Sequence, residues 1–186
     1  NMGKYKVIDG NEACAHISYM FTEIAGIYPI TPASPMSEYI DKWSTEGRLN
    51  LFNNRVKLIE MQSEAGAIAL VHGSLQTGSL ASTYTASQGL LLMIPSMYKI
   101  AGEMLPCVIN VASRTVATHA LSIFGDHSDI YASRSTGFCF LASSSVEDTI
   151  YMTLASYLST LKGKLPFVNF FDGFRTSHEL NKVNVP

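Results

Sequence analysis

Short apolar runs alternate along this chain with longer segments in which apolar residues recur at helical spacing. The runs have the length of buried strands, and β-branched and aromatic residues are frequent in them. They cover residues 27–30, 56–61, 80–83, 106–112, 138–142 and 166–171. Strands that are apolar throughout and alternate with helices form a parallel sheet covered by helices on both faces. The pattern therefore predicts a doubly wound, mostly parallel α/β fold.

Local signals mark the ends of several helices. Asp9 and Glu12 have the spacing of a capping box, and the helix that follows is expected to end at Gly26. Ser34 is expected to cap a second helix, with a proline at its first helical position. Pro95 should kink or split a long apolar helix. Further helices are expected after residue 63, from residue 89 towards 103, after residue 125 and from residue 144 to 163.

The stretch from residue 55 to 89 places an acidic residue at the start of an apolar helix. The alanine-rich segment after Ser63 has almost no polar face, so this helix is expected to be buried all round. Glu64 lies in its first turn, where burial makes a carboxylate costly and raises its pKa unless a partner binds it. One interpretation is that Glu64 caps free backbone N–H groups and favours the helix dipole. The other is a general acid/base, or a ligand-polarising carboxylate, at the carboxyl end of a parallel strand.

Polar residues follow four of the predicted strands. They are Thr31, Glu64, the segment 83–88 and Arg114. In parallel sheets of this kind, functional groups collect beyond the carboxyl ends of the strands. A guanidinium can bind a carboxylate through two hydrogen bonds, and a hydroxyl adds an orienting one. Arg114 and Thr31 together therefore favour a site for a carboxylate.

The composition argues for a chain with a covered surface. Only 15% of its 186 residues are charged, against about 25% in typical soluble domains. No apolar run approaches the roughly 18 residues of a membrane span, so a membrane protein is not expected. We infer a piece of a larger polypeptide or an obligate oligomer. The net charge of −2 without a cluster of Lys or Arg argues against nucleic acids and anionic membranes as partners.

The three cysteines indicate a reducing compartment. Cys14, Cys107 and Cys139 are far apart and form no metal-binding spacing, so no metal or iron–sulfur site is expected on this chain. The start of the chain is polar and lacks the apolar core of a signal peptide. A cytoplasmic location follows from these two observations.

Five segments closely resemble the N-terminal domain of pyruvate:ferredoxin (flavodoxin) oxidoreductase. They are YPITPAS at residues 28–34, QSEAGA at 62–67, TYTASQGLLLMIP at 83–95, HALSIFGDHSD at 119–129 and FFDGFRTSHE at 170–179. The resemblance runs from about residue 9 to 179, nearly the whole chain. Ser113 departs from the family, which more often has alanine before the arginine, and leaves Arg114 in place.

In that family this domain is the pyrimidine-binding half of a thiamine diphosphate site. The resemblance implies that Glu64 binds the cofactor through N1′ of its aminopyrimidine and acts in catalysis. It also implies that Thr31 and Arg114 hold the carboxylate of pyruvate. The implied reaction is the oxidative decarboxylation of pyruvate to acetyl-CoA and CO₂ with coenzyme A. The electrons pass through iron–sulfur clusters to ferredoxin or flavodoxin, and a homodimer is expected.

Other parts of such an enzyme are missing from the sequence. There is no Gly-Asp-Gly segment for the pyrophosphate, and no cysteine set that could hold a cluster. The chain is therefore expected to be one domain, residues 1–186, of a longer enzyme whose other domains hold Mg²⁺ and the clusters. Residues 177–186 are expected to begin a linker. By itself the chain is expected to be inactive.

Three other interpretations stay open. The first is another oxidoreductase of the same superfamily, acting on 2-oxoglutarate, a branched-chain oxoacid or indolepyruvate. The second is a degenerate, non-catalytic domain of the same fold that serves assembly. The third is a hydrolase that uses His127 with Asp126 or Asp129, although the opening of a helix by Gly-Asp-His-Ser is more typical of N-capping.

Overall fold

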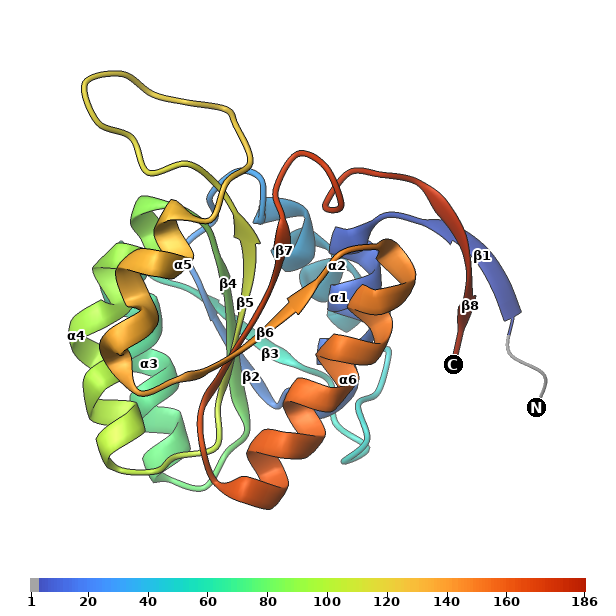
Figure 1. Ribbon diagram of the computed structural model, residues 1–186. Coiled ribbons are helices and arrows are strands. Elements are labelled where there is room, and N and C mark those ends of the chain that lie inside the picture. The colour runs from blue at the N-terminus through green and yellow to red at the C-terminus, as the bar shows by residue number, and fades with distance from the viewer. Residues whose placement is uncertain (1–3) are drawn as a thin grey trace.

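A computed structural model describes residues 4–186 and contains one six-stranded sheet with helices on both faces (Figure 1). The strands run in the order β3-β2-β4-β5-β7-β6, and every neighbouring pair is parallel. The predicted doubly wound α/β fold is confirmed.

The sheet strands are β2 (Ile24–Ile27), β3 (Lys57–Glu60), β4 (Ala81–Thr85), β5 (Val108–Ser113), β6 (Cys139–Ser143) and β7 (Phe167–Asp172). The helices are α1 (Gly10–Phe21), α2 (Ser34–Thr45), α3 (Glu64–Gln76), α4 (Gln88–Gly102), α5 (Ser128–Ser133) and α6 (Val146–Gly163), with a 3₁₀ turn at Arg134–Thr136.

The core lies on both faces of the sheet. On one face α3, α4 and α5 pack together, and on the other α1 packs against α2 and α6 (Figure 1). Strand β5 serves both faces, because Ile109 and Val111 pack with α3 and α4 while Val108 packs with α1 and α6. All six residues of β5 are buried, as its uninterrupted apolar sequence predicts.

The first helix and strand differ from the prediction. Asp9 caps α1 as expected and accepts a hydrogen bond from the Glu12 backbone N–H at 2.8 Å. The helix ends at Phe21, because Thr22 is extended, and the strand occupies 24–27 and not 27–30. Gly26 lies inside this strand, where an added Cβ would lie 2.9 Å from the Ala67 carbonyl oxygen of α3. This glycine permits a close approach of strand and helix and does not stop α1.

Three predictions of burial and capping were also wrong, and of the two outcomes expected at Pro95, a kink or a split, the split does not occur. β3 and β6 form the edges of the sheet and are only partly buried, since each has a neighbour on one side. α3 exposes Ala65 and Ala69, so its alanines do not all face the core. Ser34 begins α2 without capping it; the N-cap is Ala33, which has no side-chain hydrogen bond. α4 continues through Pro95 as one helix and is not split.

Two strands were not predicted. β1 (Lys4–Ile8) pairs antiparallel with β8 (Asn181–Val185) in a separate two-stranded ribbon, with Tyr5 opposite Asn184. Most of these residues are exposed or polar, so no buried run marks them. Residues 181–185, expected to begin a linker, therefore pair with the first described strand. Among the described residues, none of the helices is both long and apolar enough to span a membrane.

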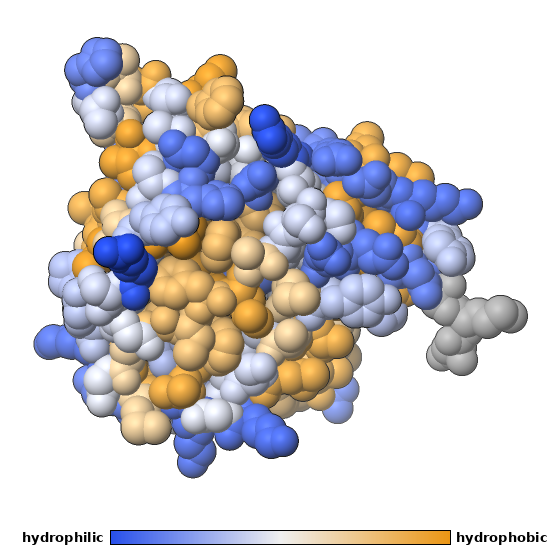
Figure 2. All heavy atoms as spheres, in the orientation of Figure 1, coloured by the Kyte–Doolittle hydropathy of each residue, from blue (hydrophilic) through white to orange (hydrophobic). Residues whose placement is uncertain are grey.

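Apolar side chains remain exposed on the long connection between β5 and α5. Leu121, Ile123 and Phe124 expose 76%, 75% and 64% of their surfaces. This loop projects from the body in Figure 1, and Figure 2 shows apolar residues on it beside polar ones. Such a surface is typical of a chain that packs against further protein.

Candidate active site

The candidate site lies at the carboxyl edge of four neighbouring strands. Thr31 follows β2, Glu64 follows β3, Thr85 ends β4 and Arg114 follows β5. Because β3, β2, β4 and β5 are neighbours and parallel, these residues share one edge of the sheet. The chain leaves β2 for β3 on one side and returns to β4 on the other. This is a topological switch point, where open α/β sheets bind ligands.

Glu64 is buried and does not cap its own helix. Its surface is 7% exposed. Ser63 is the N-cap of α3, and its Oγ accepts a hydrogen bond from the Gly66 backbone N–H at 3.2 Å. Among the described residues, no group donates a hydrogen bond to the Glu64 carboxylate. The capping interpretation of Glu64 is therefore wrong, and a buried carboxylate is left free for a ligand.

Gly89 at the start of α4 packs closely against Glu64 and Thr85. A Cβ at Gly89 would collide with Thr85 Oγ1 and lie 3.0 Å from Glu64 Oε1. Thr85 Oγ1 is itself buried and has no hydrogen-bond partner among the described residues. A free carboxylate and an unpaired hydroxyl fit a ligand with hydrogen-bonding nitrogens, such as an aminopyrimidine. The sequence singled out the turn containing Gly89 but gave no role to Thr85 or Gly89.

Arg114 and Thr31 are brought together, but not through the threonine hydroxyl. Arg114 is 7% exposed. Its Nη1 donates to the Thr31 backbone carbonyl at 3.0 Å, and its Nε donates to the Ser122 carbonyl at 2.8 Å. The guanidinium also lies 5.7 Å from the centre of the Phe174 ring. Nη2 has no partner among the described residues, and Thr31 is exposed, so both can still contact a carboxylate.

Asp129 fixes the backbone of two site segments, a role that the sequence did not reveal. It is fully buried. Its Oδ2 accepts hydrogen bonds from the backbone N–H groups of Ser87 at 2.9 Å and Arg114 at 3.0 Å. Its Oδ1 accepts from the Ser113 hydroxyl at 3.0 Å and from the Ile130 N–H at 2.8 Å. Burial raises the pKa of Asp129, and these hydrogen bonds oppose the rise.

The acidic partner of His127 differs from the one that the hydrolase interpretation requires. Its Nε2 and Asp172 Oδ1 are 2.6 Å apart, so its acidic partner comes from the end of β7. Asp126 instead accepts hydrogen bonds from the N–H and hydroxyl of Ser128. Asp129 is occupied by the four donors described above. Neither Asp126 nor Asp129 is free to orient His127 as a general base.

Comparison with known proteins gives the family. A family model described as "Pyruvate flavodoxin/ferredoxin oxidoreductase, thiamine diP-bdg" matches residues 17–186. Pyruvate:ferredoxin oxidoreductase of Moorella thermoacetica is 59% identical over 180 residues, which are 97% of this chain and 15% of that protein. Pyruvate-flavodoxin oxidoreductase of Klebsiella pneumoniae is 58% identical over 183 residues, 98% of this chain and 16% of that protein. The chain thus spans less than a fifth of either relative.

A solved structure shares the fold. It is the 2-oxoglutarate:ferredoxin oxidoreductase of Magnetococcus marinus with 2-oxoglutarate, coenzyme A and succinyl-CoA bound. The TM-score is 0.85 at 22% identity, over 99% of this chain and 32% of the other. By the family model and the close relatives, this chain belongs to the pyruvate flavodoxin/ferredoxin oxidoreductase family and matches its N-terminal thiamine diphosphate-binding domain.

Proposed function

We propose that this chain binds the aminopyrimidine of thiamine diphosphate and the carboxylate of pyruvate within a longer enzyme. The observation that carries the proposal is the Glu64 side chain, which is buried at the carboxyl edge of the sheet and whose carboxylate has no hydrogen-bond donor among the described residues. The relatives at 58–59% identity are named for pyruvate, which supports this substrate over other 2-oxoacids.

Glu64 holds a proton that it shares with the bound heterocycle. A buried carboxyl group exchanges a proton with a ring nitrogen more readily than one that water solvates, because no solvent shell must be displaced. The unpaired Thr85 hydroxyl offers the ring a second polar contact. When bound, thiamine diphosphate supplies the nucleophilic carbon and accepts the electron pair released as CO₂ leaves.

Arg114 and Thr31 orient the substrate. The free Nη2 of Arg114 binds the pyruvate carboxylate, and the Thr31 hydroxyl adds a hydrogen bond that fixes its direction. Two contacts on one carboxylate hold the 2-oxo carbon in a single orientation, which lowers the entropy cost of the reaction. The hydrogen bonds from Arg114 to the carbonyls of Thr31 and Ser122 keep the guanidinium in place.

The remaining functions belong to parts of the enzyme outside this chain. The reaction converts pyruvate and coenzyme A to acetyl-CoA and CO₂ and releases two electrons, which iron–sulfur clusters carry to ferredoxin or flavodoxin. Other domains hold the clusters and the Mg²⁺ of the cofactor. The chain acts as one domain of a homodimeric, cytoplasmic enzyme. The small share of its relatives that it spans supports this division.

The test is Glu64→Gln in the complete enzyme. Glutamine keeps the size of the side chain but has no carboxyl proton, so proton exchange at C2 of bound thiamine diphosphate should slow by about 10²–10⁴-fold. The enzyme with bound cofactor is placed in deuterated solvent, the exchange is stopped at set times by quenching, and the remaining proton at C2 is measured by NMR. Glu60→Gln is the matched control, because Glu60 is exposed at the end of β3. An unchanged exchange rate in Glu64→Gln, with cofactor bound, would exclude Glu64 from this role.

A further inference from the structure

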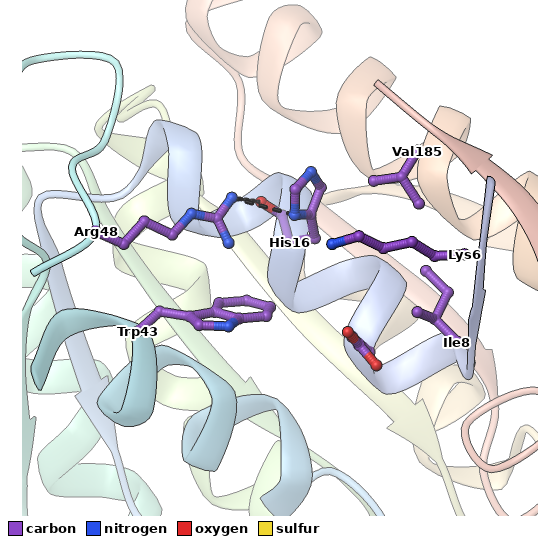
Figure 3. A pocket seen from close by; sticks show the side chains of 7 residues that line it. Lys6, Ile8, His16, Trp43, Arg48 and Val185 are labelled. Carbon is purple, nitrogen blue, oxygen red and sulfur yellow. Dashed lines mark hydrogen bonds between the residues drawn. The ribbon is translucent and has the colours of Figure 1, made fainter. Parts of the chain in front are cut away.

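A second cavity lies between the β1–β8 ribbon and helices α1 and α2. Its volume is about 320 Å³, and it is separate from the residues of the candidate active site. Figure 3 shows it from close by, with Lys6 and Arg48 entering from opposite sides towards His16. The lining combines two cations with an imidazole, an indole and two aliphatic side chains: Lys6, Arg48, His16, Trp43, Ile8 and Val185.

Arg48 is held rigidly but has no acidic partner. Its guanidinium lies 4.5 Å from the centre of the Trp43 ring and 4.8 Å from that of Tyr19. Its Nη2 donates to the His16 carbonyl at 3.2 Å and lies 3.2 Å from His16 Nδ1. No carboxylate of the described residues lies within 4.0 Å of Arg48 or Lys6. A half-buried cation that is fixed yet unpaired is costly unless an anion neutralises it.

The other polar groups that line the cavity, on His16 and Glu12, do not neutralise the charge of Arg48 or Lys6. His16 Nε2 is buried and makes no side-chain hydrogen bond among the described residues, although the backbone of Pro186 lies close enough to the ring to affect its pKa. Glu12, the one acid on the lining, accepts a hydrogen bond from the Tyr39 hydroxyl at 3.3 Å. Trp43 does not offer a free face for an aromatic ligand, because Tyr39 stacks on it at 5.2 Å and Arg48 covers it as well.

We propose that this cavity binds a small molecule through a carboxylate or phosphate group held between Lys6 and Arg48. The planar guanidinium offers two parallel donors to such an oxyanion, and the ammonium adds a point charge. Ile8 and Val185 give the carbon part of the molecule an apolar wall. The site shares no lining residue with Thr31, Glu64 or Arg114, so it does not depend on the proposed function.

The intrinsic fluorescence of the chain can report this binding. Trp43 is the only tryptophan in the sequence, and it contacts Arg48 directly. Inorganic phosphate and acetate are titrated separately into the 186-residue chain, with sodium chloride keeping the ionic strength constant. At least one of them should change the Trp43 fluorescence in a saturable way, and the tighter of the two identifies the head group.

Variants then locate the binding. Lys6→Gln should weaken it about tenfold, and Arg48→Gln should weaken it further. Lys4→Gln, on the same strand but outside the lining, should leave it unchanged, and Glu12→Gln should tighten it because a like charge is removed. Lys6 is exposed, so its variant keeps the fold even if Arg48→Gln does not; circular dichroism checks this. Three results would overturn the proposal: a fluorescence change that does not saturate, one that chloride alone reproduces, or one that keeps the wild-type affinity in Lys6→Gln.

Discussion

At the residue scale, the site depends on polar groups that are buried and left without partners. Such groups are rare, because each costs about 1–3 kcal/mol when no hydrogen bond compensates it. Thr85 Oγ1 is such a group, and Gly89 packs closely against it and against Glu64, which has no hydrogen-bond donor on its carboxylate among the described residues. The sequence placed Glu64 correctly, since an acid in the first turn of an apolar helix stands out. It gave no sign of Thr85, because a threonine in a strand is ordinary.

At the residue scale, the titration of His16 predicts how the stability of the fold depends on pH. Burial, together with the nearby charge of Arg48, lowers the pKa of His16 from 6.5 to about 4. Between these values the unfolded chain binds a proton that the folded chain does not, so stability is lost as the pH falls from 6.5 towards 4. Lys6 and Arg48 face His16 from β1 and from the segment after α2, and Glu12 lies one turn earlier on α1.

Urea unfolding of the chain at pH 7.5 and at pH 5 measures this effect. The wild-type chain should lose more stability between the two pH values than His16→Gln, which cannot titrate. His119→Gln should behave like the wild type, because His119 is exposed on the loop before α5. Equal pH dependence in the wild type and His16→Gln would show that His16 is not a source of acid sensitivity.

At the scale of the elements, the order and type of the sheet strands and helices followed from hydrophobic periodicity. The errors lie where burial comes from tertiary contacts that no local pattern contains. Gly26 lies inside β2, where α3 approaches so closely that a side chain would not fit. Ala65 of α3 is exposed, although an alanine in an apolar segment resembles a core residue in sequence. β1 and β8 pair although they lie near opposite ends of the sequence, so no local sequence pattern indicates their pairing. Arg114 directly follows β5 as predicted, and Thr31 lies beyond the carboxyl end of β2, which ends earlier than predicted.

Asp129 gives the prediction at this scale, since it joins α5 to the ends of β4 and β5. An asparagine has one oxygen acceptor, so in either orientation its NH₂ group would face a backbone N–H of Ser87, Arg114 or Ile130. Asp129→Asn should therefore lower the free energy of unfolding by about 1–3 kcal/mol. In the complete enzyme it should also raise the KM for pyruvate, because Arg114 loses its backbone support.

Urea unfolding and steady-state kinetics check these two effects. Asp41→Asn is the control, because Asp41 is an exposed carboxylate on α2. Full stability and an unchanged KM in Asp129→Asn would show that the four hydrogen bonds do not position the site.

At the scale of the whole molecule, the surface agrees with a domain that is covered by other protein. Charged residues are only 15% of the chain. Leu121, Ile123 and Phe124 are exposed on the loop whose Ser122 carbonyl accepts a hydrogen bond from Arg114. The loop therefore connects the substrate side of the candidate site to an apolar surface. The sequence predicted a covered chain from its low charge, but the position of the apolar loop needed the fold.

The central claim is that the buried Glu64 carboxyl shares a hydrogen bond with the aminopyrimidine of thiamine diphosphate. The most direct measurement is a crystal structure of the complete enzyme with the cofactor bound. The account predicts a Glu64 carboxylate oxygen about 2.6–2.9 Å from a pyrimidine ring nitrogen. A pyrimidine bound elsewhere, or a Glu64 carboxylate directed away from every ring nitrogen, would contradict it.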